Sequence, residues 1–270
     1  MFPGANADRD DAAYVMVGAP LDVSTSFRPG ARFGPDRLRR FAEPFEDYDH
    51  RTGQFFTDLA VHDHGNVHAW DDAAEYVEYV SGLLDSVLSE GAVPILLGGE
   101  HTVSRAGVEA VDPDVFVAID AHLDLREAYD GNPWSHATVT RHALDVADRA
   151  VILGARSGSE AEWERAGAAD VTPVPPGAVP DWEPDFTGET TVYLSIDADA
   201  ADPGFAPGTG TAEPFGLSPR EMRDVVRAVA PAASGADLVE VNDRDDGQAA
   251  SLGAKLIREF VYSHAAERSD

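Results

Sequence analysis

The chain has 270 residues, of which 49 are acidic and 20 are basic, and it contains no cysteine. Without cysteine there is no disulfide, thiolate metal ligand or cysteine nucleophile, so any metal has to be held by oxygen and imidazole. The formal net charge of −29 repels nucleic acid and anionic membranes, and we expect neither as a partner.

The acidic residues are interleaved with regular apolar segments, which favours a folded protein with an acidic surface over a disordered chain. Lys255 is the only lysine. This composition suits a cytosol with molar salt, where the screening length is only about 3 Å and self-repulsion is largely cancelled. We therefore expect a halophilic source.

No targeting or membrane-spanning segment is evident. Residues 1–11 lack the basic region and apolar core of a signal peptide. No apolar run approaches the roughly 20 residues that a membrane helix needs. The sequence therefore predicts a soluble, cytoplasmic protein.

Eight short apolar runs predict strands of the kind that is buried on both faces of a sheet. In chain order they are Ala13–Val17, Leu59–His62, Val93–Leu97, Val115–Ile119, Ala150–Leu153, Asp170–Val174, Thr191–Ile196 and Asp237–Val241. Helices are predicted at Asp71–Glu90, from the capping box at Ser218 to about Val229, and at Gln248–His264. This alternation predicts a three-layer α/β/α fold around a mostly parallel eight-stranded sheet, in one domain spanning residues 1–270.

Candidate metal ligands gather at the carboxyl ends of these strands, where chemistry collects in open parallel sheets. Asp120, His122 and Asp124 follow one strand. An extended chain points residues i, i+2 and i+4 to the same side, so these three side chains can face one cavity. Asp197 and Asp199 repeat this spacing at the end of another strand.

A second imidazole comes from His101, because Gly98-Gly99 permits a tight bend after its strand. Four carboxylates and two imidazoles suit Mn²⁺ or a similar divalent ion. This set exceeds what one catalytic ion needs, whereas two ions about 3.5–4 Å apart, bridged by carboxylate and a shared hydroxide, use all of it. An isolated Asp-x-Asp is usually a turn former or helix cap, but the convergence of three motifs favours a metal site.

These metal motifs resemble those of the ureohydrolase family, which comprises arginases, agmatinases and formiminoglutamases. The resemblance covers most of the chain, implies an arginase-like fold and a homo-oligomer (a trimer or hexamer), and is closest to archaeal agmatinases. Beyond the metal motifs, it is carried by Gly18–Asp22, Arg28–Pro35, Ser135–Thr138 and Phe205–Thr211.

The resemblance also implies a role for each site residue. Two Mn²⁺ ions would be bound, the first by His101, Asp120, Asp124 and Asp197, and the second by Asp120, His122, Asp197 and Asp199. Asp120 and Asp197 would bridge the ions, and a bridging hydroxide would attack the guanidinium carbon to give urea and an amine. Asp124 would also orient the hydroxide, Glu240 would hold the guanidinium, and His136 would transfer a proton.

Hydrolysis of agmatine to putrescine and urea is the leading interpretation, and guanidinobutyrate, arginine and formiminoglutamate stay open as alternative substrates. All present a similar planar group to the metals, so the tail discriminates among them. The Arg126–Asn132 loop is where groups that bind the tail would lie. Its acidic residues, Glu127 and Asp130, favour a tail that ends in an amine.

Two other classes of protein are open. A single-metal deacetylase of related fold would leave His101 and Asp199 without a role. A metal-binding regulator without activity is disfavoured, because Glu240 and His136 are both present.

Two further clusters have structural interpretations. The histidines His62, His64 and His68, with Asp63, could hold another metal, but a solvated loop after a strand is favoured. The arginines among acids, Arg37, Arg39 and Arg40, are expected to make surface or subunit contacts.

Overall fold

The computed structural model describes residues 1–186 and 188–268 of the chain. Its centre is an eight-stranded sheet in the order β4-β1-β5-β10-β9-β6-β7-β8, and all neighbouring strands are parallel. The prediction of an eight-stranded α/β fold is therefore confirmed. The strands are β1 (Tyr14–Ala19), β4 (Val61–Asn66), β5 (Val93–Gly98), β6 (Val115–Ile119), β7 (Arg149–Leu153), β8 (Val171–Val174), β9 (Val192–Asp197) and β10 (Ala233–Val239).

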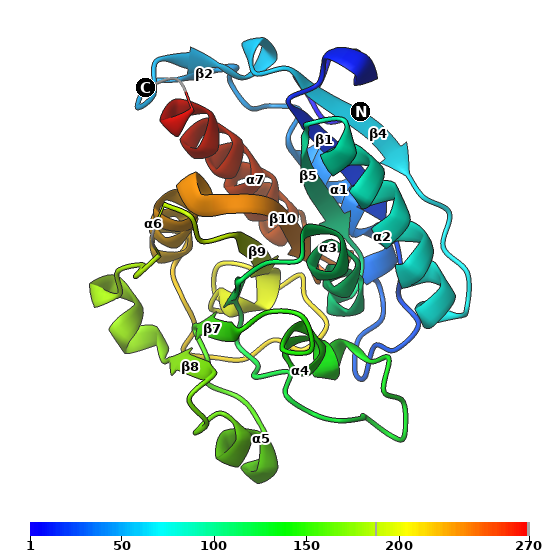
Figure 1. The fold of residues 1–270 in the computed structure, drawn as a ribbon, viewed down its shortest axis with the longest axis vertical. Coiled ribbons are helices and arrows are strands. Elements are labelled where there is room, and N and C mark those ends of the chain that lie inside the picture. Colours follow the sequence, from blue (N-terminus) through cyan, green and yellow to red (C-terminus); the bar gives the residue numbers. More distant parts are fainter. Residues whose placement is uncertain (187, 269–270) are drawn as a thin grey trace.

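Helices cover both faces of this sheet (Figure 1). One layer consists of α1 (Gly34–Phe41), α6 (Pro219–Val229) and α7 (Gln248–Glu267). The other consists of α2 (Ala73–Ser89), α3 (Ser104–Val111) and α4 (Val139–Ala143). A short helix, α5 (Glu160–Arg165), follows β7.

Strand β6 shows why the strands are continuous apolar runs in the sequence. Val117 and Ile119 pack on the side of α6 and α7, whereas Phe116 and Ala118 pack on the side of α4. Because successive side chains of a strand point to opposite faces, a sheet covered on both faces needs an apolar residue at every position.

The order of the strands brings four carboxyl ends together. The chain forms one half of the sheet with β1, β4 and β5 and the other half with β6, β7 and β8, and it then places β9 and β10 between the halves. Strands β5, β10, β9 and β6 are therefore neighbours in the middle of the sheet, and the loops that leave them converge at one edge.

The three predicted helices are present, with ends close to those expected. At α6 both hydrogen bonds of the capping box form. The backbone N–H of Glu221 donates to the Ser218 hydroxyl, and the backbone N–H of Ser218 donates to the Glu221 carboxylate. Helix α7 continues beyond His264 to Glu267. The sequence does not predict α1, α3, α4 and α5, because each has eight residues or fewer and offers too few turns to show an apolar period.

Two regions of β structure differ from the prediction. Strand β10 begins at Ala233, four residues before the expected start. The sequence does not reveal this early start, because Ser234 and Gly235 are poor strand formers and interrupt the apolar run. A two-residue hairpin formed by β2 (Tyr48–Asp49) and β3 (Gln54–Phe55) is absent from the prediction, since strands this short leave no alternation to detect.

Strand β4 lies at one edge of the sheet and extends through Asn66, so the expectation of a solvated loop is wrong for residues 62–66. His68 lies in an exposed loop beyond the strand, as expected. Asp63 is buried in this strand, and its carboxylate accepts hydrogen bonds of 2.8 Å from Nε and Nη2 of Arg39. Arg39 is itself buried, which corrects the expectation of a surface or subunit contact for this residue.

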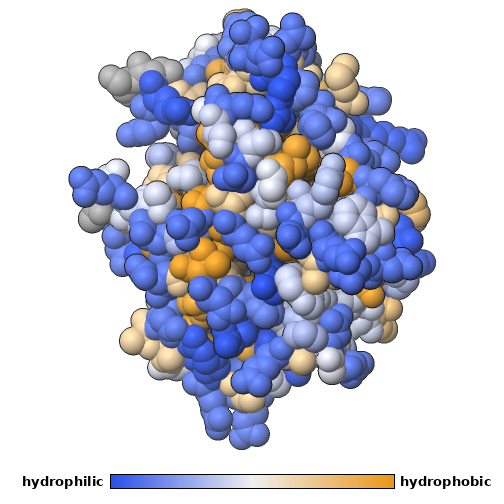
Figure 2. All heavy atoms as spheres, turned by 45° about the vertical axis from the view of Figure 1, so that its right-hand side comes forward, coloured by the Kyte–Doolittle hydropathy of each residue, from blue (hydrophilic) through white to orange (hydrophobic). Residues whose placement is uncertain are grey.

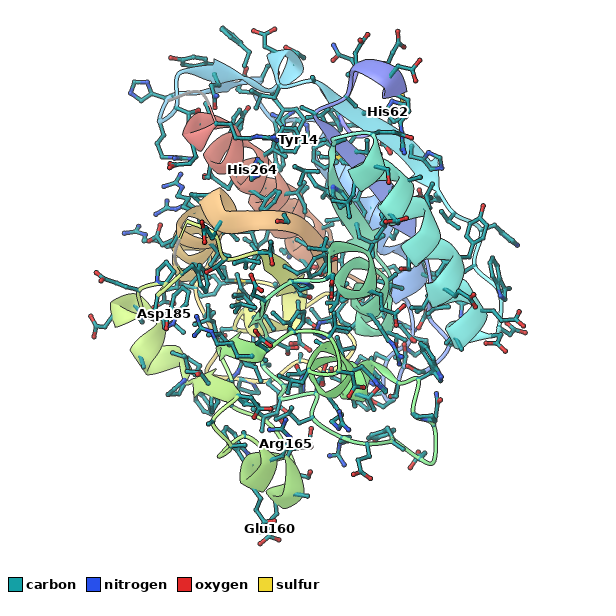
Figure 3. The ribbon with its side chains drawn as sticks, viewed as in Figure 1. Tyr14, His62, Glu160, Arg165, Asp185 and His264 are labelled. Atoms are coloured by element: carbon teal, nitrogen blue, oxygen red, sulfur yellow. The ribbon has the colours of Figure 1, made fainter. Side chains whose placement is uncertain are left out.

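Labelled side chains show the two ends of the molecule. His62, Tyr14 and His264 lie at one end, and Glu160 and Arg165 of α5 lie at the other (Figure 3). Because α5 follows the carboxyl end of β7, the His62 segment lies toward the amino end of the sheet, away from the converging loops.

Hydrophilic residues predominate on the face drawn in Figure 2, where the most hydrophobic residues occupy hollows between them. This distribution agrees with the acidic composition of the chain. Within residues 1–186 and 188–268, no helix combines the length and apolar character needed to cross a membrane.

Candidate active site

The candidate site lies where the four central strands end side by side. His101 comes from the turn after β5, Asp120 follows β6, and Asp197 is the last residue of β9. The turn after β5 requires glycine, because a Cβ at Gly99 would lie 1.9 Å from the carbonyl oxygen of Leu21. This close approach joins the loop after β1 to the turn that carries His101.

A first group of possible ligands surrounds the Nδ1 atom of His101. This atom lies 2.9 Å from Oδ2 of Asp124 and 3.1 Å from Oδ2 of Asp120. Oδ2 of Asp197 lies 3.5 Å away. The group joins residues from the ends of β5, β6 and β9, so the fold itself assembles it.

A second group adjoins the first. Nδ1 of His122 lies 3.1 Å from Oδ2 of Asp199 and 3.6 Å from Oδ1 of Asp120. Asp120 thus directs one oxygen toward each group, which is the arrangement expected of a bridging carboxylate. In the described ranges the candidate metal sites are His101 with Asp120 and Asp197, and His122 with Asp120 and Asp199. Neither includes a residue of the His62 segment.

Both groups fit divalent cations. Nδ1 of His101 and Oδ2 of Asp120 are buried without a hydrogen-bond partner. A buried polar atom left unpaired costs about 1–3 kcal/mol, and coordination of an ion by these atoms removes that cost. Carboxylates with imidazole and no sulfur suit manganese and similar ions.

The crowding of acids shifts several pKa values. Burial opposes the charged form of His101, but the adjacent carboxylates of Asp120 and Asp124 outweigh this and raise its pKa well above the usual value. Burial and the charge of Asp120 raise the pKa of Asp124 to about 6. Burial and the charges of Asp199 and Asp120 raise the pKa of Asp197 well above its usual range. Cations between these carboxylates would relieve their mutual repulsion.

Glu240 belongs to neither ligand group. It leaves β10 with a φ of 61°, and its N–H donates to the carbonyl oxygen of Gly99 at 2.8 Å. Its Oε1 accepts a 2.8 Å hydrogen bond from the backbone N–H of His101 and lies 3.9 Å from Nδ1 of His136. Burial raises the pKa of Glu240 to about 8 in spite of the hydrogen bond from His101.

His136 begins a short 3-10 helix and is held from two sides. Its backbone N–H donates to Oγ of Ser24 at 2.9 Å, and its Nε2 lies 3.0 Å from Oγ of Ser26. Burial, together with the positive charges of His101 and His122, lowers the pKa of His136 to about 4. The imidazole is therefore neutral near pH 7 and able to accept a proton.

A cavity of about 280 Å³ opens above the ligand groups. Its charged residues away from the ligands are Arg126 and Glu162, whose Nε and Oε2 lie 3.2 Å apart. Glu127 and Asp130 do not line it, so the sequence argument for an amine tail from these two residues is not supported. The lining residues are Ser26, His122, Asp124, Arg126, Tyr129, His136, Ala137, Ser157, Gly158, Ser159, Glu162, Asp197, Asp199 and Thr211.

The structure brings together all the side chains that the sequence singles out as ligands, with Glu240 and His136 beside them. Sequence patterns do not point to Ser24 and Ser26, which contact His136, because no local pattern relates residues this far apart. Glu162 is also not singled out, although a capping box marks it. The Ser159 side chain accepts a hydrogen bond from the Glu162 backbone N–H, and the Glu162 side chain accepts one from the Ser159 backbone N–H.

Comparisons with known proteins cover nearly the whole chain. A family model described as the arginase family matches residues 12–262. The agmatinase of Halalkalibacterium halodurans is 34% identical, over 97% of this chain and 95% of that protein. The guanidinobutyrase of Pseudomonas aeruginosa is also 34% identical, over 95% of this chain and 87% of that protein.

Solved structures agree with the sequence relatives. The agmatine ureohydrolase of Thermoplasma volcanium superposes with a TM-score of 0.94 at 31% identity, and the match covers 99% of this chain and 95% of that one. Enzymes of the matched family are hydrolases that act on C–N bonds and depend on two metal ions, in keeping with the two adjoining ligand groups. In sequence, in fold and in the composition of its site, the chain belongs to the arginase family.

Proposed function

We propose that this enzyme is an agmatinase, which hydrolyses the guanidino group of agmatine to putrescine and urea. The observation that carries the proposal is that two ligand groups share Asp120 while Glu240, a carboxylate outside both groups, lies beside them. A single-metal deacetylase needs only one such group. The agmatinase and agmatine ureohydrolase relatives support the choice of substrate.

Two divalent ions, with manganese the proposed metal, would supply water of lowered pKa, so that hydroxide is available near neutral pH. The contacts of His101 and His122 support one ion in each ligand group. The proposed ligands are His101, Asp120, Asp124 and Asp197 for the first ion, and Asp120, His122, Asp197 and Asp199 for the second.

Glu240 is proposed to bind the substrate guanidinium, since a carboxylate accepts two parallel hydrogen bonds from this planar cation. The N–H of His101 fixes the carboxylate, so the guanidinium carbon is held in one place relative to the ligand groups. Asp124 is proposed to orient the attacking water by accepting a hydrogen bond. Nδ1 of His136, on the side of Glu240, is the proposed atom that accepts the remaining proton of the attacking hydroxide and passes it to the leaving amine.

A second candidate, hydrolysis of guanidinobutyrate, is favoured by Arg126. Its guanidinium lines the cavity and is held by Glu162 and by the ring of Tyr129, whose centroid lies 5.5 Å away. A cation that lines the same cavity as the ligand groups suits a carboxylate tail. The guanidinobutyrase relative supports this alternative, and arginine and formiminoglutamate stay in the panel of candidates.

Steady-state kinetics of the manganese-loaded enzyme test the substrate. Urea release is measured with agmatine, guanidinobutyrate and arginine, and formamide release with formiminoglutamate. We expect the highest kcat/KM with agmatine. A higher value with guanidinobutyrate would favour the second candidate, and no product from any of the four would contradict the proposal.

The remaining proposals concern the setting of the enzyme. The acidic composition supports a soluble, cytoplasmic enzyme of a halophile whose partner is a small cationic guanidino compound rather than nucleic acid or a membrane. We also propose that residues 1–270 form one ureohydrolase domain that assembles into a homo-oligomer, a trimer or hexamer. Light scattering in molar KCl measures this mass directly.

A further inference from the structure

Glu100 is a buried acid that neither ligand group contains. Its side chain is fully enclosed. Oε2 accepts a 2.8 Å hydrogen bond from the backbone N–H of Ser24, and Oε1 accepts another of 2.8 Å from the Ser24 hydroxyl. The Thr102 hydroxyl adds a third at 3.0 Å. The Thr25 hydroxyl lies 3.4 Å from Oε2. A buried carboxylate is tolerated when it is hydrogen-bonded in this way, and both of the 2.8 Å bonds come from Ser24, in a distant loop.

The loop that contains Ser24 is fixed at both ends by Asp22. The Asp22 carboxylate accepts hydrogen bonds from the N–H of Gly30 at 2.8 Å and from Nε of Arg32 at 3.1 Å. It also accepts one from the Thr25 hydroxyl. Residues 22–30 therefore form a closed loop, and Glu100 is bonded to Ser24 within it. The bonds of Asp22 and Glu100 together restrict movement of Ser24.

This loop is also the support of His136. The Ser24 hydroxyl donates its single proton to Glu100 and accepts the 2.9 Å hydrogen bond from the N–H of His136. Two residues later, Oγ of Ser26 lies 3.0 Å from Nε2 of the same histidine. A continuous path of hydrogen bonds thus runs from Glu100 through Ser24 to His136, and the ring is held from the other side by the same loop.

We propose that Glu100 is a positioning residue for His136 and acts through Ser24, while Ser26 holds the ring so that Nδ1 faces Glu240. The inference rests on the proposed function, which gives His136 a proton-transfer role. A catalytic group displaced by about 1 Å can lose on the order of 100-fold in rate, so a loop that fixes the ring has a direct effect on turnover. Glu100 thus serves catalysis without touching substrate or metal.

The test replaces Ser24, because Glu100 adjoins the proposed ligand His101 and its own replacement could disturb a metal. Ser24→Ala removes the acceptor for His136 and one donor to Glu100. We expect kcat/KM for agmatine to fall by about 10- to 100-fold, mainly through kcat, with two manganese ions per chain retained. Ser86→Ala is the matched control, since the Ser86 hydroxyl donates to the carbonyl oxygen of Leu83 within α2 and bonds neither Glu100 nor His136. It should change kcat/KM by less than about 3-fold.

A double-mutant cycle separates positioning of His136 from general support of the loop. If Ser24 acts through His136, Ser24→Ala should have little further effect in a His136→Asn background. The same cycle with Glu100→Gln should give the same result, provided its metal content stays at two. Additive losses, or loss of metal in Ser24→Ala, would overturn the proposal.

A crystal structure of manganese-loaded Ser24→Ala provides a readout that does not depend on the substrate. We expect His136 to leave its position beside Ser26, where Nε2 and Oγ lie 3.0 Å apart in the unaltered chain. An unmoved ring would overturn the proposal whether or not agmatine is hydrolysed. Failure of the wild type on agmatine would instead contradict the proposed function and leave this structural test in force.

Discussion

The two ligand groups differ in how far each is enclosed. The His101 side chain is 1% exposed, and behind it Nε2 lies 3.0 Å from the hydroxyl of Ser195, which donates in turn to Asp237 at 2.8 Å. The His122 side chain is 24% exposed and lines the cavity. The first group is therefore enclosed by protein, whereas the second opens toward the space that a substrate would enter.

This difference separates two tasks. An enclosed imidazole backed by a hydroxyl and a carboxylate is held in one orientation and one tautomer, which strengthens metal binding. An imidazole at the cavity wall leaves room for exchange of water, substrate and the ion itself. We infer that the first ion is the more firmly held and that the second is the more exchangeable.

The largest effect is expected at Asp120, whose Oδ2 faces His101 and whose Oδ1 faces His122. Asp120→Ala removes a proposed ligand from both groups at once. Metal content should therefore fall below one ion per chain. Activity should fall by at least about 1,000-fold, because metal ions supply several kcal/mol of transition-state stabilisation. Elemental analysis and urea release measure both, and a variant that keeps two ions would show that Asp120 does not bridge.

The next effect should be confined to the open group. Asp199→Ala removes the carboxylate 3.1 Å from His122 and leaves the first group complete. We expect one ion per chain, a loss of activity of about 100-fold or more, and little change in the far-UV spectrum or in the melting temperature in high salt. Glu127→Ala, an acid of the neighbouring loop that does not line the cavity, is the control and should behave as wild type.

Glu240→Gln should leave both groups intact and impair the use of the substrate. A charged hydrogen bond contributes about 1.5–3 kcal/mol, which corresponds to a loss of kcat/KM of about 10- to 100-fold. The loss should include kcat, because the same contact holds the carbon for attack. Metal content should stay at two ions, and a variant that loses metal would make Glu240 a ligand.

Chelation should reveal the unequal enclosure of the groups without any substitution. Dilute EDTA is expected to remove the two ions in separate phases. The rate constant of the slower phase, assigned to the ion at His101, should be about 10-fold or more below that of the faster phase, because Ser195 and Asp237 support the His101 ring. Metal content is followed during dialysis together with activity. Loss of both ions in a single phase would contradict the distinction between an enclosed and an open site.

Salt should act on the whole molecule and on neither group in particular. The chain has 49 acidic and 20 basic residues. The unpaired acidic side chains repel one another at low ionic strength, and counter-ions relieve this repulsion. The melting temperature of the metal-loaded enzyme should rise by several degrees between about 0.1 M and about 2 M KCl. A flat profile would show that local ion pairs already neutralise the charge.

The proposed ligands could be predicted from the sequence because each lies within a few residues of a strand end. Asp120, His122 and Asp124 follow β6 directly, but β6 ends at Ile119 and Asp124 has a φ of 50°, so the expected extended chain does not continue through all three residues. The contacts of His136 could not be predicted, since Ser24 lies 112 positions away. Arg39 shows the same limit, because its pairing with Asp63 depends on how α1 packs on the edge of the sheet.

Length and glycine account for most of what the sequence misses in the fold. Helix α5 has six residues, too few for an apolar period, although its capping box is evident. The start of β10 is hidden by Gly235, where a Cβ would lie 2.9 Å from a methyl group of Val111. A residue selected for close packing thus resembles a turn when only the sequence is considered.

Anomalous diffraction from crystals of the manganese-loaded enzyme tests the central claim most directly. We predict two peaks about 3.5–4 Å apart, one beside His101 and Asp124 and the other beside His122 and Asp199, with the peak at His101 the more fully occupied. A single peak would contradict the binuclear site. A single zinc in active enzyme would favour the deacetylase interpretation.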